Sequence, residues 1–153
     1  MDSLELAVPP PVVTLVIGLA MWLLAFLFPQ LALPFTGGEI TAVLIALLGL
    51  SISMAGVITF KRARTTVDPR KPADASVLVT SGVYRISRNP MYLGILLALI
   101  GWGVFLGNAL ALLCAFLFIP YISRYQIRPE ERLLQVRFGT AFAAYKKQVR
   151  RWI

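Results

Sequence analysis

The sequence of 153 residues contains no histidine and a single cysteine, Cys114. The lack of histidine excludes imidazole-based catalytic triads, histidine-ligated metal sites and imidazole proton shuttles. A lone cysteine cannot form an internal disulfide and lacks the partners of a metal site. We therefore predict no bound metal, and we expect Cys114, which lies inside an apolar run, to be a small buried side chain.

Charged residues are also scarce. They make up 14% of the chain, whereas soluble domains carry about a quarter. Hydrophobic residues make up 58% and fall into long blocks that no soluble core of this size could bury. The composition therefore predicts one integral membrane domain over residues 1–153. The net charge of +8 would suggest nucleic acid as the partner of a soluble protein, but here the positions of the charges give another explanation, and we predict no nucleic-acid partner.

Apolar blocks predict an all-α membrane fold of about four transmembrane helices. We expect helices over about 11–28, 40–60, 90–106 and 108–125. The last reaches its full length only if Arg124 snorkels to the interface. The first is expected to be a retained helix and not a signal peptide, because Asp2 and Glu5 precede it and no Lys or Arg does. Only Gly107-Asn108 separates the last two blocks, which predicts an antiparallel helical hairpin.

Small residues recur in the second block at near-helical spacing: Gly49, Ser51, Ser53 and Gly56. Such a stripe lets helices approach closely in lipid, so we expect a packing face and not a site. Residues 61–90 are polar and contain prolines, which predicts an extended segment at the membrane surface. Residues 128–153 follow a helical pattern that begins with Pro129 and two glutamates, which predicts an amphipathic helical tail.

All 15 Lys and Arg residues lie in two segments, the loop between the second and third blocks and the region from Arg124 onward. The positive-inside rule therefore predicts that this loop and both termini are cytoplasmic. Apart from Arg124, at the end of the fourth block, the apolar blocks contain no charged side chain. Intramembrane charges normally mark transport pathways and proton relays. Any site must therefore be assembled from the cytoplasmic loop and the tail.

Two polar clusters in those segments are candidates for a site. Arg88 and Asn89 precede the proline that begins the third helix, so they lie at a helix N-terminus, where free N–H groups favour an anionic ligand group. Tyr84 and Tyr92 add aromatic faces that can contact a cation. The second cluster is Arg128-Pro-Glu-Glu131. Taken separately, each also fits an ordinary interpretation, since Arg and Tyr are common interfacial anchors and paired acids are common in a first helical turn.

Taken together, the clusters carry a resemblance. Residues 77–152, about half the chain, look like the C-terminal half of the isoprenylcysteine carboxyl methyltransferases and the related phospholipid methyltransferases, and the chain resembles a short, bacterial-type member. The matching elements are Leu78-Val-Thr-Ser-Gly-Val-Tyr84, Arg88-Asn-Pro-Met-Tyr-Leu-Gly94, Glu130-Glu131, Phe138-Gly139, Tyr145 and Arg150-Arg-Trp152. Their order and spacing agree throughout, which is far more specific than any one motif. The first two helices carry no such signature.

The resemblance implies a membrane methyltransferase that uses S-adenosylmethionine without a Rossmann domain and binds it through residues 76–153. The acceptor would be a small lipophilic molecule or a membrane lipid, methylated at O, N or S, and the location would be a bacterial inner membrane. The implied cofactor-binding residues are Ser76, Val77, Leu78, Val79, Tyr84, Asn89, Pro90, Met91, Tyr92, Glu130 and Glu131. Arg88, Arg124 and Arg128 are the predicted catalytic residues.

Two positions depart from the prenylcysteine enzymes. Asn89 stands where that family has a histidine, and Gln126 stands where its substrate-facing arginine falls, although Arg124 and Arg128 flank this position. The acceptor implied by the resemblance therefore stays open among an isoprenylcysteine-like carboxylate, a lipid amine and a thiol. Two other classes of function also fit a small basic membrane protein. A small four-helix transporter would need an ionisable residue at mid-membrane depth. A non-catalytic anchor that holds anionic lipid would need positive charge but no particular order of residues.

Overall fold

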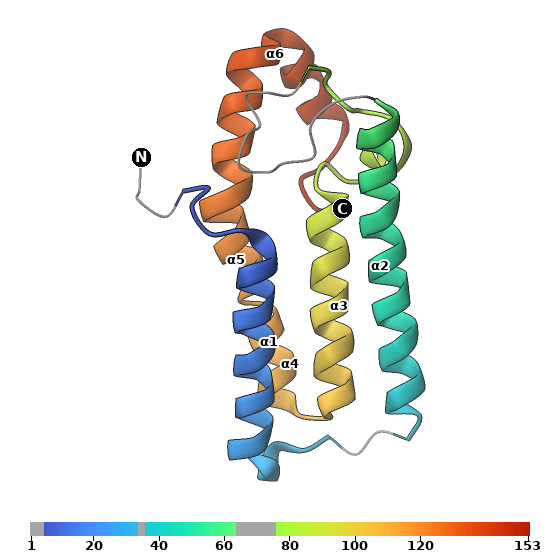
Figure 1. Ribbon diagram of the computed structural model, residues 1–153, viewed down its shortest axis with the longest axis vertical. Coiled ribbons are helices and arrows are strands. Elements are labelled where there is room, and N and C mark those ends of the chain that lie inside the picture. The colour runs from blue at the N-terminus through green and yellow to red at the C-terminus, as the bar shows by residue number, and fades with distance from the viewer. Residues whose placement is uncertain (1–4, 34–35, 64–75) are drawn as a thin grey trace.

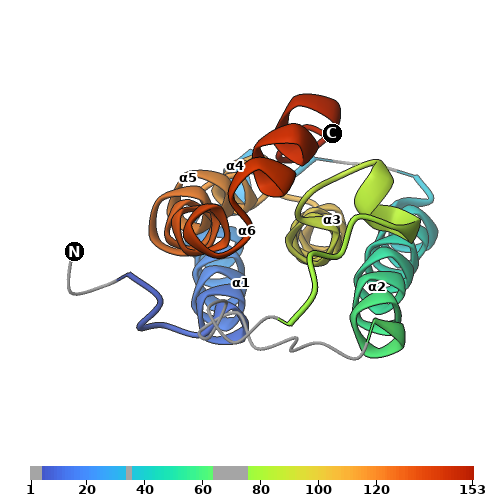
Figure 2. The same ribbon diagram turned by 90° about the horizontal axis from the view of Figure 1, so that it is seen from above.

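The computed structural model describes residues 5–33, 36–63 and 76–153, and these residues form helices and no β-strand. The long helices α1 (Pro10–Leu27), α2 (Gly38–Arg62) and α3 (Pro90–Leu106) stand beside a fourth column made of α4 (Ala109–Ala115) and α5 (Phe118–Ile122) (Figure 1). Seen from above, α3 lies between α2 and the pair formed by α1 and α4 (Figure 2). The predicted all-α membrane fold is confirmed.

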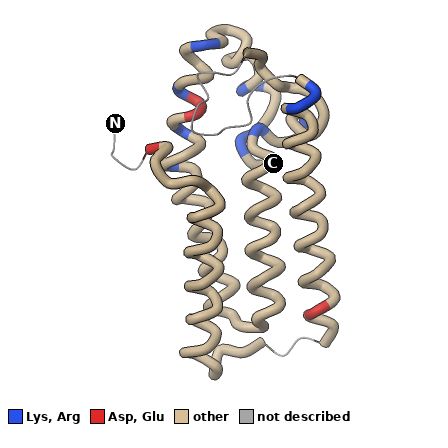
Figure 3. The backbone as a smooth tube through the Cα atoms, viewed as in Figure 1, with Lys and Arg blue, Asp and Glu red and all other residues tan. Residues whose placement is uncertain are grey.

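Three helical stretches are long and apolar enough to cross a membrane: Pro10–Leu27, Gly38–Arg62 and Ala109–Gln148. The fourth apolar helix, α3, is shorter at 17 residues. Lys and Arg of the described residues gather at one end of the bundle, the end where α6 (Arg128–Gln148) lies (Figure 3). Glu39 belongs to the first turn of α2, at the opposite end. The charge asymmetry expected from the sequence is therefore present in the folded chain.

The turn between α3 and α4 is built on Gly107 and Asn108. Gly107 has a φ of 55°, a left-handed conformation that glycine adopts without steric cost. Asn108 then caps α4, because its Oδ1 accepts hydrogen bonds from the backbone N–H groups of Leu110 and Ala111 at 3.0 and 3.1 Å. Its Nδ2 donates to the carbonyl of Phe28 at 2.9 Å, which ties the hairpin to the end of α1.

The fourth column is less regular than the single helix expected over 108–125. Pro120 has no N–H, and its ring disfavours the preceding α-helical turn. There the backbone tightens, with Ile119 N–H donating to the Phe116 carbonyl three residues back at 3.1 Å. The π-helical turn η4 (Ser123–Ile127) follows α5 and leads directly into α6. The predicted tail is thus a continuation of the fourth column and not a separate segment.

Small residues bring α2 and α3 into close contact. A Cβ added at Gly94 of α3 would collide with the Gly49 carbonyl and with Ser53 of α2. The Ser53 hydroxyl donates to the Met91 carbonyl across the same interface at 3.1 Å. Three members of the predicted packing stripe (Gly49, Ser53 and Gly56) therefore face α3. The fourth, Ser51, is exposed and bonds within its own helix, to Leu47.

A leucine at Gly94 is expected to separate α2 from α3, because no flexible side chain can move aside to admit it. Gly94→Leu should abolish the recovery of folded protein or lower the apparent midpoint of thermal unfolding in detergent by roughly 10 °C or more. The matched control is Gly18→Leu, since a Cβ at Gly18 meets nothing within 4 Å. Equal midpoints for the two variants would contradict this packing.

Candidate active site

The segment that precedes α3 holds the C-terminal tail in place. The guanidinium of Arg88 donates through Nη1 to the carbonyls of Lys146 and Val149 at 3.1 and 3.2 Å. Its backbone N–H donates to the Arg150 carbonyl at 3.0 Å. The next residue, Asn89, donates through Nδ2 to the Arg151 carbonyl at 2.9 Å. These bonds give partners to carbonyls at and just beyond the end of α6 (Arg128–Gln148), and they fasten the tail to the start of α3.

Glu131 joins the same assembly from the first turn of α6. Its carboxylate accepts from Arg88 Nη2 at 2.9 Å and from Arg151 Nη2 at 2.6 Å. The hydrogen bond to Glu131 raises the pKa of Arg151 above its ordinary value. The Arg88 and Glu131 side chains are 12% and 16% exposed, so this pair is shielded from solvent more than a surface ion pair. The two sequence clusters are thus physically joined.

The neighbouring glutamate makes a different set of contacts. Oε1 of Glu130 accepts from the Tyr92 hydroxyl at 2.6 Å and from Gln126 Nε2 at 2.9 Å. Tyr92 and Gln126 are buried, at 6% and 3% exposure. No arginine or lysine of the described residues forms an ion pair with Glu130. Its carboxylate is therefore oriented by neutral donors. Burial, partly offset by these two hydrogen bonds, raises the pKa of Glu130 to about 7, so the group is mostly ionised only above neutral pH.

Tyr84 lies under the tail, in the short helix η3 (Gly82–Arg85). Its carbonyl accepts from the Tyr145 hydroxyl at 2.7 Å, and its ring meets Phe60 edge to face at 5.2 Å. The Tyr84 hydroxyl is buried and has no hydrogen-bond partner among the described residues. Burial, with smaller effects from Tyr145 and Glu130, raises the pKa of Tyr84 above its usual value. The hydroxyl is therefore a protonated donor without a partner among the described residues, and it lies within electrostatic reach of the Glu130 carboxyl group.

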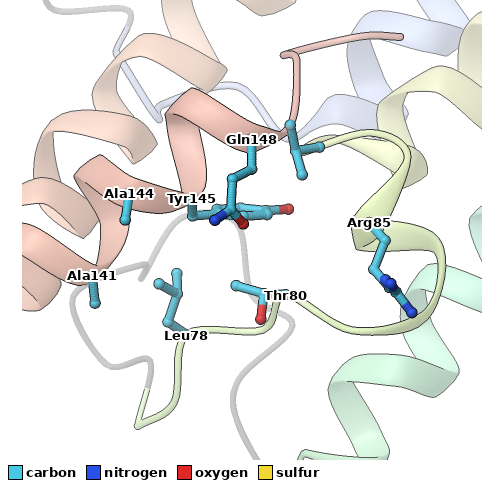
Figure 4. Close-up of a pocket in the computed structure, with 8 residues that line it drawn as sticks. Leu78, Thr80, Arg85, Ala141, Ala144, Tyr145 and Gln148 are labelled. Atoms are coloured by element: carbon cyan, nitrogen blue, oxygen red, sulfur yellow. The ribbon is translucent and has the colours of Figure 1, made fainter.

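A pocket of about 590 Å³ opens between the 78–85 segment and the second half of α6 (Figure 4). Gly139, with φ 49° and ψ −119°, bends α6 and turns its last residues over that segment. The lining residues are Leu78, Thr80, Arg85, Ala141, Ala144, Tyr145, Gln148 and Val149. The walls therefore combine apolar side chains with the polar groups of Thr80, Arg85, Tyr145 and Gln148.

The other residues predicted for the site lie at the pocket, against α2, or on η4 and α6. Leu78 lines the pocket, Val79 is buried, and Ser76 and Val77 are exposed. Pro90 and Met91 pack against the α2 backbone at Gly56. Arg124 and Arg128 are exposed on η4 and α6 and are not part of the ion-pair assembly of Arg88, Glu131 and Arg151.

Sequence reasoning did not assign a role to Gln126 or Arg151. Gln126 lies four residues before Glu130, a spacing that puts both side chains on one helical face and could have drawn attention to the pair. Arg151 gave no comparable signal, because its partner Glu131 is twenty residues away in sequence and meets it only through the folded tail. The described residues contain no group of three His, Cys, Asp or Glu side chains that could hold a metal ion.

Comparison with known proteins identifies the family of this chain. The family model described as phospholipid methyltransferase matches residues 38–141. A protein of Haemophilus influenzae is 46% identical over 63 residues, which is 41% of this chain and 100% of that protein. The probable protein-S-isoprenylcysteine O-methyltransferase of Oryza sativa subsp. japonica is 31% identical over 125 residues, 82% of this chain and 65% of the relative.

Protein-S-isoprenylcysteine O-methyltransferase B of Arabidopsis thaliana is 29% identical over 103 residues, 67% of this chain and 52% of the relative. The chain thus spans about half to two thirds of the length of these plant relatives, 52% and 65%. The family match covers both the α2–α3 pair and the start of α6, where the two clusters meet. The resemblance predicted from the sequence motifs is confirmed, and the chain belongs to the phospholipid methyltransferase family.

Proposed function

We propose that this protein is a membrane methyltransferase that uses S-adenosylmethionine and methylates a lipophilic acceptor at the basic end of its helical bundle. The observation that carries the proposal is the meeting of two sequence clusters about 40 residues apart. Tyr92 of α3 bonds Glu130, and Arg88 pairs with Glu131, at 2.6 and 2.9 Å. Family membership indicates the reaction class. The junction formed by Arg88, Tyr92, Glu130 and Glu131 is where we propose that the reaction takes place.

The residues at the junction fit the chemical groups of the cofactor. S-adenosylmethionine carries a sulfonium, an ammonium, a carboxylate and ribose hydroxyls. Above its raised pKa of about 7, Glu130 offers an anion without a cationic partner among the described residues. Two buried donors, the Tyr84 hydroxyl and Arg88 Nε, have no hydrogen-bond partner there. Buried polar groups are normally satisfied, so these atoms fit a ligand that would satisfy them.

In this proposal the cofactor supplies an electrophilic methyl group, and the protein binds, orients and shields the reacting partners. Glu130 would hold a hydroxyl or ammonium group, and Tyr84 and Arg88 would donate to ligand oxygens or nitrogens. Arg124 and Arg128 remain our candidates for contacts to the acceptor, since both are exposed within one turn of the buried Gln126. The apolar helices below the junction allow an acceptor to arrive from the lipid.

We further propose that the basic end of the bundle faces the cytoplasm of a bacterial cell, with the protein in the inner membrane. The gathering of Lys and Arg at the end that carries α6 supports this orientation (Figure 3). The soluble cofactor would then reach the junction from the cytoplasm while the acceptor stays in the bilayer.

The test is binding followed by transfer. Purified protein in detergent should bind S-adenosylmethionine in titration calorimetry, at micromolar to submillimolar affinity. Incubation with methyl-labelled cofactor and a total lipid and small-thiol extract should then yield a labelled lipophilic product, which identifies the acceptor. A folded, monodisperse sample that binds no S-adenosylmethionine would contradict the proposal and favour a non-catalytic anchor.

A further inference from the structure

Gln126 is a buried polar residue in the π-helical turn η4, with 3% of its surface exposed. π-helical turns interrupt regular helices at a cost and occur frequently at functional sites. Resting on the proposed function above, we propose that Gln126 is a positioning residue, which fixes the Glu130 carboxylate in the orientation that binds S-adenosylmethionine. Gln126 stands where the prenylcysteine enzymes have a substrate-facing arginine, so the family pattern does not supply this positioning role.

The geometry at Glu130 is asymmetric. The Tyr92 hydroxyl and Gln126 Nε2 approach from α3 and η4, and both donate to the same oxygen, Oε1, at 2.6 and 2.9 Å. No side-chain hydrogen bond from the described residues reaches the other oxygen, Oε2. Two donors on one oxygen fix the rotation of the carboxylate and leave Oε2 for a hydroxyl or ammonium group of the ligand.

The turn that carries Gln126 is itself held on both sides. The carbonyl of Tyr125 accepts from the Leu6 N–H at 3.0 Å, and Ile127 is fully buried in the core. One turn further along, Arg132 pairs with Glu5 of the same N-terminal segment at 2.6 Å. The backbone at Gln126 is therefore fixed, and its amide can hold Glu130 at a set distance.

The neutrality of the amide matters as much as its reach. A lysine or arginine at this position would also donate to Glu130, but it would cancel the charge that a cationic ligand needs. Glutamine donates without adding charge. The arrangement therefore orients the carboxylate and, above its pKa of about 7, preserves its attraction for an ammonium or sulfonium.

The experiment compares Gln126→Met with the wild type by titration of S-adenosylmethionine in detergent. Methionine keeps the length of the side chain and removes the donor, so the affinity should fall about tenfold. Gln30→Met is the matched control, because Gln30 is exposed in η1 (Pro29–Leu31) at the far end of the bundle, and its affinity should equal that of the wild type. The same substitution is then made in a Glu130→Gln background, where Gln126→Met should weaken binding less than about twofold.

The outcomes separate this inference from the proposed function. A wild type that binds no cofactor contradicts the proposed function. A wild type that binds while Gln126→Met binds equally well overturns the positioning role. A full additional loss in the Glu130→Gln background overturns it too, because Gln126 would then act independently of Glu130. If Gln126→Met and Gln126→Leu both fail to fold, as judged by monodispersity and thermal unfolding, Gln126 serves the fold and the inference is overturned.

Discussion

Replacing Arg88 by methionine is expected to release the C-terminal tail from the bundle. The substitution removes the donors of two tail carbonyls and one of the two arginine partners of Glu131. Removing one partner of a shielded ion pair is costly, and Glu131 keeps Arg151, so we expect a loss of about 2–4 kcal/mol in the free energy of unfolding. The apparent thermal midpoint should fall by roughly 5–15 °C.

Hydrogen exchange locates the effect. Amides of residues 140–153 should lose protection in Arg88→Met, while those of α2 and α3 should keep it. Arg85→Met is the matched control, because Arg85 is an exposed arginine of the same segment, at the rim of the pocket. Arg88→Lys should fall between the two, since an ammonium cannot reproduce the fork geometry of the guanidinium. Unchanged protection of the tail in Arg88→Met would show that other contacts hold it.

Glu130→Gln is expected to have the largest effect on ligand binding. The amide oxygen of the new side chain can still accept from Tyr92 and Gln126, so at about pH 8.5, above the raised Glu130 pKa of about 7, the packing stays and only the charge is lost. Hydrogen bonds to charged groups contribute about 1.5–3 kcal/mol, which predicts a 10- to 150-fold loss of affinity for S-adenosylmethionine. The thermal midpoint should change by no more than about 2 °C. Titration calorimetry and thermal unfolding of the same sample measure both quantities.

Two other glutamates make this test specific. Glu39→Gln changes a charge at the opposite end of the bundle and should leave the affinity unchanged. Glu131→Gln should instead lower stability, because Arg88 and Arg151 both lose their charged partner. Adjacent residues would then have separable roles, one in ligand binding and one in holding the tail. If Glu130→Gln lowers stability and leaves affinity intact, that assignment of roles is wrong.

Much of the fold was predictable because it depends on local composition. Apolar blocks of sufficient length indicate spanning helices whatever surrounds them. Gly107-Asn108 predicted a tight hairpin, since a left-handed glycine followed by a capping asparagine is a local solution to ending one helix and starting the next. The clustering of Lys and Arg at one end followed from their positions between the blocks.

The site was predictable only in part. The order of motifs identified the family and named Tyr92, Glu130 and Glu131. The sequence also suggested that Arg88 meets an anionic ligand at a helix N-terminus. In the structure its Nη1 and Nη2 groups bond tail carbonyls and Glu131, and only Nε is left without a partner among the described residues. Those acceptors lie 43 to 61 residues away in sequence, so no local pattern could reveal them.

The sequence by itself determined the membrane class, the helices, the charge asymmetry and the identity of the polar clusters, because each depends on residue type and short-range spacing. The tertiary structure alone decided which of two adjacent glutamates is paired with arginine and which is held by neutral donors, with its pKa raised by burial. It also placed Gln126 beside Tyr92 and built the pocket from the 78–85 segment and the end of α6. These contacts depend on the path of the chain through Pro120, the π-helical turn η4 and the bend at Gly139. That path is set only when the helices pack against one another.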